Sequence, residues 1–260
     1  MTLAYGRNSG LDFPRLHCTG ETCWLPAGHG PVGIVDAIAQ SCNAYFAQLA
    51  TRLGPAALLE VPRLGAWNLH PGPLPRYAGL NAPSWAIYHG ERSHGVTVHR
   101  MERGIDTGDI AYQDCFPIEE TDTGLSLSLR CAERGVGLVQ RLLQDAPAIR
   151  RRPQDATLRS YFGRAAPQGG RIDWHSPARR IYDFVRACDY GPFPSPWGVP
   201  RARLGDDEVE IRKLALTGER CTAAPGTVRG DRVAAADEWL LLHQRAEPKR
   251  SGRLSERLGY

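Results

Sequence analysis

The chain has 260 residues, of which 42% are hydrophobic, and its formal net charge is +4 at pH 7. This length and composition suit a folded core in one large or two modest domains, and the mild charge argues only weakly for a nucleic-acid partner. No apolar run approaches the roughly 20 residues that cross a bilayer, and Met1–Gly10 lack the layout of a secretory signal, so we expect no membrane span. The seven cysteines are widely spaced without a CxxC pair, which argues against a metal site or a disulfide framework and favours reduced thiols in the cytoplasm.

Residues 1–63 form an atypical N-terminal segment. Apolar residues recur at helical spacing over Gly33–Leu53, which predicts an amphipathic helix closed by Gly54 and Pro55. A nucleotide-type α/β domain normally opens with a buried strand and a glycine-rich turn, and neither pattern is visible here.

Residues 64–200 alternate between β and α patterns. Glycine and proline residues separate the elements, and alternating β-branched residues mark the strand at 95–100. In chain order we predict a strand at Gly65–Leu69, a proline-rich loop at 71–79, a helix at Ala82–His89, and strands at Gly95–Arg100 and Ile110–Phe116.

A long helix is predicted at Thr121–Leu143, because apolar residues recur along it with a helical period. The following residues, 146–170, are rich in Pro, Arg, Gln and Gly, and we expect a mobile surface connection. Another helix runs through Ala187, with Ser176 as its N-cap and Pro177 at its first position. The residues expected on the inner face of the long helix are Leu125, Leu129, Ala132, Val136, Val139 and Leu143.

The last part of the chain reads as a small β domain, residues 201–247. Its short β-like runs are Glu210–Leu216, Thr227–Val233 and Trp239–His243. The basic tail, residues 248–260, is expected to be disordered.

Two turns carry the polar side chains that acyl transfer to an amine requires. Asn68 and His70 end the first strand of the α/β region, and their spacing of two puts both side chains on one face. Their N–H groups suit the stabilisation of an oxyanion, to which each donor contributes about 3–4 kcal/mol. Asp106 lies on the loop between the next two strands, where a carboxylate orients an imidazole or accepts a proton through water. Each group alone would usually be structural, as a strand cap or an Asx turn, whereas the ordered combination is specific.

Four segments of this region are long, ordered motifs: Asn68–Gly79, Gly95–Met101, Gly104–Ile110, and Ile172–Trp174 with the proline-rich exit to Trp197. Together they resemble the 10-formyltetrahydrofolate-dependent formyltransferase family, in a methionyl-tRNA formyltransferase-like pattern. The resemblance implies an α/β fold, with a partial Rossmann-like catalytic domain at residues 64–200 followed by a small β-barrel-like C-terminal domain.

By this resemblance, Asn68, His70 and Asp106 are the catalytic residues. Arg76 and Tyr77 lie near the substrate entrance and are substrate-binding residues. The cofactor-binding residues that line the pterin pocket of the folate are Gly104, Ile105, Thr107, Gly108 and Asp109.

Three further histidines, His89, His94 and His99, have no partner carboxylate that is evident in the sequence. We therefore expect them to be surface or strand residues rather than catalytic ones.

The N-terminal segment resembles a different family, the penicillin-binding transpeptidases. The pattern is Gly28–Gly30 followed by Ala37–Phe46, in which Ser41 and Asn43 match a Ser-x-Asn motif. The nucleophile motif Ser-x-x-Lys and the later Lys-Thr-Gly or Lys-Ser-Gly are absent from the chain, so we expect no transpeptidase activity. The formyltransferase family ordinarily places a βαβ half-domain in this position.

The sequence predicts a formyltransferase that moves a formyl group from 10-formyltetrahydrofolate to a primary amine, with an activity impaired by the missing N-terminal half-domain. The acceptor is left open among an aminoacyl-tRNA, an amino sugar and a carrier-bound amino acid, and the Arg-rich residues 149–152 are compatible with tRNA phosphates. One alternative is a 10-formyltetrahydrofolate hydrolase, in which water replaces the amine. Another is an inactive or chimeric fragment that acts at most as a binding module. No metal and no membrane partner are expected.

Overall fold

The computed structural model describes residues 62–246 continuously and, before them, residues 15–19, 27–33, 36–37, 44–45, 48–49, 51–52, 54 and 59. In the earlier part, β1 (Leu16–Cys18) pairs antiparallel with β2 (Gly30–Val32). The residues that the structure describes between 36 and 52 are helical, in agreement with the predicted amphipathic helix. Ser41, Asn43 and the tail 248–260 lie outside the described residues.

The N-terminal segment has a small hydrophobic cluster of its own. Leu16, Cys18 and Val32 of the hairpin are buried together with residues of the following helical positions. The latter are Ala37, Ala44, Tyr45 and Leu49.

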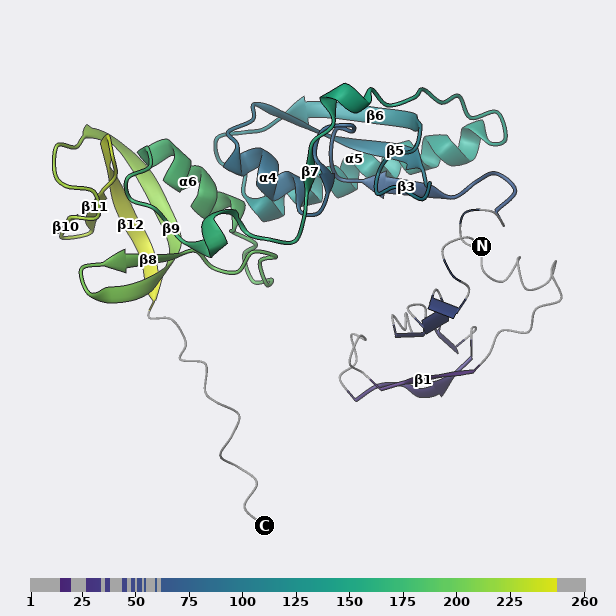
Figure 1. Cartoon of the computed structure of the whole chain (residues 1–260), viewed down its shortest axis with the longest axis horizontal. Helices are drawn as coiled ribbons and strands as arrows, with labels where there is room; N and C mark the ends of the chain where they lie inside the picture. Colours follow the sequence, from purple (N-terminus) through teal and green to yellow (C-terminus); the bar gives the residue numbers. More distant parts are fainter. Residues whose placement is uncertain are drawn as a thin grey trace, which may run out of the picture.

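The central sheet has three antiparallel strands in the order β3-β5-β6 (Figure 1). They are β3 (Trp67–His70), β5 (Ser93–Arg100) and β6 (Ile110–Pro117), which confirms the three predicted strands to within two residues at each end. Asn68 lies opposite His99 and His70 opposite Thr97. Within the described residues, β3 pairs only with β5, so its other side is a sheet edge.

Two helices pack beside this sheet. The short α4 (Ala82–Tyr88) follows the proline-rich loop, and α5 (Gly124–Asp145) packs against β5 and β6. A capping box starts α5: Ser126 N–H donates to the Thr123 hydroxyl, and Thr123 N–H donates to the Ser126 hydroxyl.

The predicted inner face of α5 was wrong. Leu129 is 60% exposed, Val136 57%, Val139 36% and Leu143 71%. The helix instead buries a second set of residues, which lies about a third of a turn away and includes Leu127, Cys131, Gly135 and Leu142. The helix therefore has two apolar faces, and the sheet takes the one with smaller residues.

Residues 146–170 are an ordered connection rather than a mobile one. Within them, β7 (Tyr161–Phe162) pairs parallel with β4 (Ala78–Gly79), and Arg152 bridges Ile110 through two backbone hydrogen bonds of 2.9 Å. Short 3₁₀ turns at Ala156–Leu158 and Pro167–Gly170 complete the connection. We call residues 151–162 the strap.

The C-terminal part is a five-stranded, nearly closed antiparallel sheet in the order β10-β11-β12-β9-β8 (Figure 1). This confirms the β-barrel-like domain. Helix α6 (Ala178–Ala187) packs against α4 and β9. The strands are β8 (Arg201–Leu204), β9 (Asp207–Arg220), β10 (Val228–Arg229), β11 (Arg232–Ala234) and β12 (Glu238–Ala246).

The cap predicted for α6 was wrong. Pro177 is the N-cap and has no side-chain cap, while Ala178 N–H donates to Asp237 Oδ1 at 2.8 Å. A carboxylate from the β11–β12 connection thus takes the place expected for the Ser176 hydroxyl. In the part of the chain that the structure describes, no helix combines the length and the apolar character that crossing a membrane requires.

Candidate active site

The three predicted catalytic side chains meet at one end of the central sheet. Asn68 and His70 stand on β3, and Asp106 lies on the loop between β5 and β6. Asn68 Nδ2 is 3.4 Å from Asp106 Oδ1, and His70 Nδ1 is 3.5 Å from Asp106 Oδ2. The two residues on one strand face thus approach different oxygens of one carboxylate.

Local backbone geometry directs the Asp106 carboxylate toward β3. Asp106 has φ +54°, in the left-handed region that Asp adopts more readily than most residues. Gly79 N–H donates to Asp106 Oδ2 at 2.8 Å. A Cβ added at Gly108 would lie 2.0 Å from the Arg100 carbonyl oxygen, so only glycine fits where the loop turns back to the sheet.

The surroundings of Asp106 keep its side chain ionised. Burial raises the pKa of this carboxyl, but its contact with the His99 ring, attraction to His70 and the Gly79 N–H outweigh burial and lower the pKa to about 2. A negative charge is therefore fixed at the centre of the cluster at neutral pH.

His70 is 4% exposed at its side chain and is held in one orientation. Its Nε2–H donates to the Tyr77 carbonyl oxygen at 2.7 Å, because a carbonyl only accepts. Burial lowers the pKa of His70, opposed by Asp106 and by the Tyr77 carbonyl, so the ring is neutral at neutral pH. The neutral ring then has a bare Nδ1 on the Asp106 side. The sequence predicts that a ring N–H of His70 donates to the oxyanion. At Nδ1, on the Asp106 side, this N–H is present only when the ring is protonated.

His99 belongs to this cluster, and the expectation that it lacked a carboxylate was wrong. Its Nε2 is 3.4 Å from Asp106 Oδ1 and 3.1 Å from Asn68 Nδ2. Its Nδ1–H donates to the Arg100 carbonyl oxygen at 2.9 Å. The signal that could have found it is the strand register, since His99 lies opposite Asn68 on the neighbouring strand. Two strands that run antiparallel bring residues distant in sequence into direct contact.

The other two histidines lie away from Asp106. His94 is 1% exposed, and its Nε2 is 2.9 Å from the Pro71 carbonyl oxygen. His89 is exposed at the end of α4, where its Nδ1 is 3.2 Å from the Tyr77 hydroxyl.

The predicted cofactor-binding residues surround Asp106 on its loop. Ile105 is 58% exposed, Gly104 and Thr107 are also exposed, and Gly108 is buried. Leu80, next to Gly79, is 47% exposed. Exposed apolar side chains beside a charged carboxylate fit a planar ring with polar edges. The predicted Asp109 is half-buried and lies 3.8 Å from Arg151, so it takes part in an ion pair.

The two predicted substrate-binding residues occupy different environments. Arg76 is exposed and forms an ion pair with Glu91. Tyr77 is buried, its hydroxyl donates to Glu91 at 2.8 Å, and its ring stacks on Phe162 with 5.3 Å between centroids. The Tyr77 carbonyl, rather than its side chain, contacts the His70 ring.

The strap holds both catalytic loops, and sequence reasoning missed it. Gln154 Nε2 donates to the carbonyl oxygens of Asp106 at 2.9 Å and Gly108 at 2.6 Å. Arg159 Nη2 donates to the Ile105 carbonyl oxygen at 2.8 Å. Ser160 accepts the N–H of Tyr77 at 2.8 Å through its hydroxyl. Polar residues that looked like a solvated linker are thus donors and acceptors for the loop backbones.

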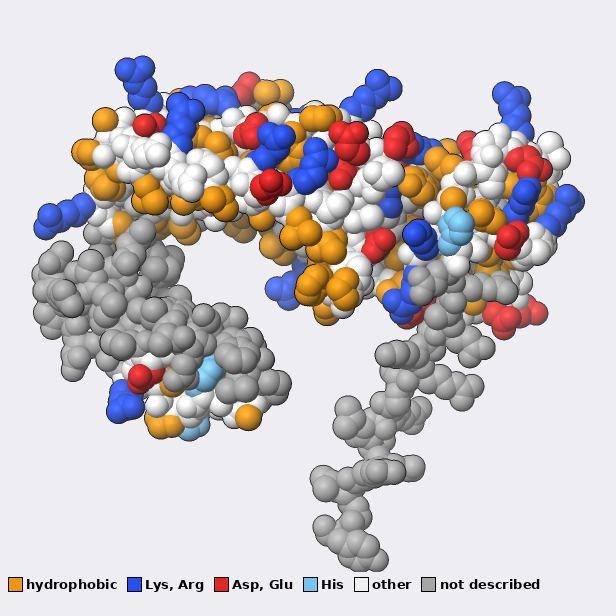
Figure 2. Space-filling view, turned by 180° about the vertical axis from the view of Figure 1, so that it is seen from behind, with side chains coloured by type: hydrophobic (Ala, Val, Ile, Leu, Met, Phe, Trp, Pro, Cys, Tyr) orange, Lys and Arg blue, Asp and Glu red, His pale blue; other side chains and the backbone are white. Residues whose placement is uncertain are grey.

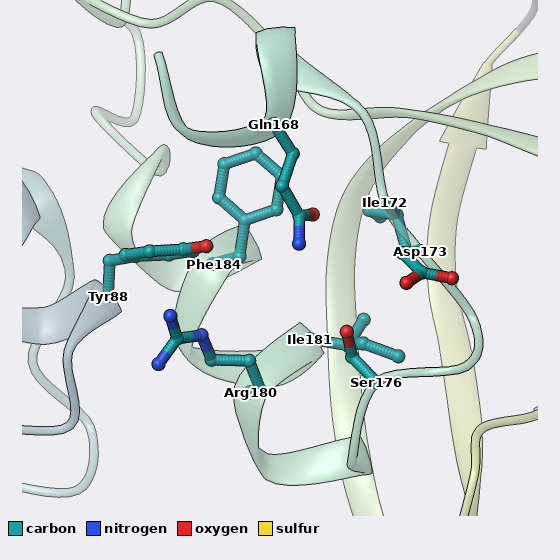
Figure 3. A pocket seen from close by; sticks show the side chains of 8 residues that line it. All are labelled: Tyr88, Gln168, Ile172, Asp173, Ser176, Arg180, Ile181 and Phe184. Carbon is teal, nitrogen blue, oxygen red and sulfur yellow. The ribbon is translucent and has the colours of Figure 1, made fainter.

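A shallow pocket lies elsewhere, between α4, α6 and the residues that precede α6 (Figure 3). Its lining includes Tyr88, Ser176, Arg180 and Phe184, and the Arg180 guanidinium lies over the Tyr88 ring at 4.2 Å. It contains no residue of the Asp106 cluster. Among the residues that the structure describes, no group of three or more His, Cys, Asp or Glu side chains is arranged to hold a metal ion.

Two family models match this chain. The model "Formyl transferase" matches residues 39–143, and the model "Formyl transferase, C-terminal domain" matches residues 164–253. The first match begins inside the segment 1–63 and includes Asn68, His70 and Asp106. Neither match supports the resemblance of the N-terminal segment to a penicillin-binding transpeptidase.

Solved structures share the fold. WlaRD, a sugar 3N-formyl transferase crystallised with dTDP and 5-N-formyl-THF, is 23% identical with a TM-score of 0.56, over 70% of this chain and 65% of WlaRD. An N-formyltransferase from Helicobacter canadensis, complexed with folinic acid and dTDP-3-aminofucose, is 18% identical with a TM-score of 0.58, over 94% of each chain. HypX from Aquifex aeolicus, in complex with tetrahydrofolic acid, is 22% identical with a TM-score of 0.51, over 71% of this chain and 32% of HypX. The chain therefore spans about two thirds of WlaRD and about a third of HypX.

Proposed function

We propose that this chain, which belongs to the formyl transferase family, transfers a formyl group from 10-formyltetrahydrofolate to a primary amine. The observation that carries the proposal is the Asp106 carboxylate, which lies within 3.5 Å of Asn68, His70 and His99. Residues 64–200 are the catalytic unit in this proposal, and residues 201–247 are a separate β domain. None of the cysteines that the structure describes forms a disulfide, which suits a reducing cytoplasm as the place of the reaction.

His70 handles the proton in the proposed reaction. The amine nitrogen bonds to the formyl carbon, and its proton passes to the bare Nδ1 of His70. Asp106, ionised because its pKa is about 2, stabilises the imidazolium that forms. The bond between the formyl carbon and N10 then breaks, and the same proton passes from Nδ1 to N10.

In this scheme, Asn68 donates a hydrogen bond to the oxyanion. Its Nδ2 has one contact of 3.1 Å with His99 and a longer one of 3.4 Å with Asp106. The longer contact is weak, because hydrogen bonds of this kind are strongest near 2.9 Å. The N–H involved is therefore available for exchange to the oxyanion, while the shorter bond keeps the amide in place.

The folate is proposed to lie against Ile105 and Leu80, beside Asp106. Both side chains are exposed and apolar, and both backbones are bonded to the strap, Ile105 through Arg159 and Leu80 through the Phe162 carbonyl oxygen. The folates bound in the structures of WlaRD, the Helicobacter enzyme and HypX support this class of donor. The nucleotide-linked amino sugar of the Helicobacter complex is one of three acceptor classes to test, beside an aminoacyl-tRNA and a carrier-bound amino acid.

The test measures release of tetrahydrofolate from 10-formyltetrahydrofolate by the full chain, with and without each amine. A transferase requires the amine and forms a formamide, whereas a hydrolase releases formate without it. His70→Ala is expected to abolish the amine-dependent rate, because no group then accepts the proton. Unchanged formamide formation by this variant would overturn the proposal.

One observation favours a second candidate function, that of a binding module. Within the described residues, no strand pairs with the free side of β3, which carries Asn68 and His70. Calorimetry with 5-formyltetrahydrofolate separates the two candidates. Heat of binding together with no amine-dependent turnover would favour the module.

A further inference from the structure

We propose that two copies of this chain associate through the exposed apolar face of α5, as an antiparallel helix pair related by a twofold axis. This inference is independent of the formyl-transfer proposal, because it rests on none of the residues around Asp106. We call the face the α5 seam. Its residues are Leu125, Leu129, Ala132, Val136, Val139 and Leu143.

The α5 seam has the spacing of a coiled-coil interface. Successive seam residues are separated by four, three, four, three and four positions, which is the alternation of a and d sites over more than two heptads. At about 1.5 Å per residue, the seam runs for about 27 Å along the helix. A strict a/d stripe is the pattern that a single partner helix covers, whereas a globular core requires a wider face.

The seam is open to solvent in the described structure. Four of its residues are 36–71% exposed, and Ala132 is exposed as well. The apolar surface continues to Leu69 of β3, which is 36% exposed. Leu69 packs closely on Gly135, because a Cβ added at Gly135 would lie 2.6 Å from the Leu69 side chain. In Figure 2, which shows the molecule from behind, hydrophobic side chains gather along the lower margin of the body that carries α5. A contiguous apolar stripe of this kind marks an interaction surface.

The described N-terminal residues are not available to cover the seam. The apolar side chains of Ala37, Ala44, Tyr45 and Leu49 are already buried against the β1–β2 hairpin. Within the described residues these side chains cannot cover the seam, and the occupant we propose is another helix that offers apolar residues at a and d spacing.

A second copy of α5 meets this requirement, because the seam reads the same in both directions. When two such helices run antiparallel with the axis beside residue 134, an a site of one faces a d site of the other along the whole seam. Leu125 then faces Leu143 of the second copy, Leu129 faces Val139, and Ala132 faces Val136. The smallest pair lies next to the axis, which lets the two backbones approach, and the largest pair closes each end.

The polar border of the seam provides a specific test of this arrangement. Ser126, Glu133 and Gln140 follow one side of the seam at e sites. In the proposed register the two Glu133 carboxylates lie on the same side of the pair near the axis, so they repel weakly. Glu133→Gln is therefore expected to tighten the dimer by about twofold, at a strength typical of such surface pairs.

The experiment is sedimentation equilibrium of the full chain over about 1–100 µM, the range in which an interface of modest size associates. A concentration-dependent dimer is expected. Val136→Glu and Leu143→Glu are expected to give monomers, since each places a charge in the seam, and both sites are exposed enough for the fold to tolerate the change. Leu158→Glu is the matched control, because Leu158 is 59% exposed and lies outside α5.

A cross-linking experiment fixes the direction of the helices. In a Cys115→Ser background, Ala132→Cys mixed with Val136→Cys is expected to form a disulfide between copies, because these positions face one another. A self-linked Leu143→Cys dimer would instead indicate parallel helices and would overturn the proposed register. A monomer at every concentration would overturn the proposal itself.

Discussion

The loop that carries Asp106 and the outer face of α5 belong to the same α/β region. The described chain supplies bonding partners for the polar groups of the loop, whereas it leaves the apolar side chains of the helix face exposed. Donors from β3, β4 and the strap converge on the carboxylate and backbone of Asp106. The α5 seam, by contrast, has four large side chains that are 36–71% exposed. Buried polar groups are hydrogen-bonded within the chain, because a buried unpaired group costs about 1–3 kcal/mol. Apolar surface has no such requirement and remains available to bind a second molecule.

The largest expected effect comes from removing the charge at the centre of the paired region. Asp106→Asn keeps the shape of the side chain but no longer stabilises the His70 imidazolium, so we expect a loss of about a thousandfold in kcat/KM. Steady-state formation of the formamide is the measurement. Asp114→Asn is the control, because Asp114 forms an exposed ion pair with Arg134 at 2.9 Å. Equal activities of the two variants would contradict the assignment.

The junction between the loop at 71–79 and the strap is expected to be the next most sensitive point. A Cβ at Gly79 would lie 2.2 Å from the Phe162 carbonyl oxygen, and Gly79 has φ +93°. Gly79→Ala should therefore separate β4 from β7 and lower the free energy of unfolding by about 3 kcal/mol, measured by urea denaturation. Gly163→Ala, where nothing lies within 4 Å of the added Cβ, is expected to be neutral. A stable Gly79→Ala protein would show that the strap is not required.

The buried ring of His94 predicts a pH dependence of stability. Burial lowers its pKa from 6.5 to about 4, and a backbone contact with Pro71 opposes that effect only partly. The unfolded chain therefore binds a proton first as the pH falls, so the free energy of unfolding decreases from pH 6.5 to pH 4, by about 3 kcal/mol in all.

Denaturation of the native chain and of His94→Gln between pH 7 and pH 4 tests this dependence. The variant should show a flatter profile, whereas identical slopes would contradict the prediction. Asp106 does not interfere, because its low pKa of about 2 removes stability only below about pH 4.

The smallest of these effects concerns the strap as a positioning element. Gln154→Ala removes two hydrogen bonds to carbonyl oxygens of the Asp106 loop and is expected to reduce kcat/KM about tenfold, the equivalent of one net hydrogen bond. Gln154→Glu should not restore activity, because a carboxylate cannot donate. Gln144→Ala on the exposed face of α5 provides the control. Full activity of Gln154→Ala would limit the strap to a role in stability.

Much of the α/β region could be predicted because its signals are local. Alternating β-branched residues located β5, and glycine and proline residues located the turns around it. His99 and the strap could not be predicted in the same way. The contacts of His99 with Asn68 and Asp106 depend on the register between strands, and the contacts of Gln154 span more than 40 residues of chain. No local pattern encodes such pairings.

By itself, the sequence determined the order of the main helices and strands, the i, i+2 placement of Asn68 and His70, and one of the two apolar faces of α5. The tertiary structure decided which face of α5 meets the sheet, which nitrogen of His70 faces Asp106, and which segment holds the Asp106 loop. The physical reason is that helical period and turn chemistry act over a few residues. Burial, tautomer and hydrogen-bond partner are set by whatever the fold brings alongside.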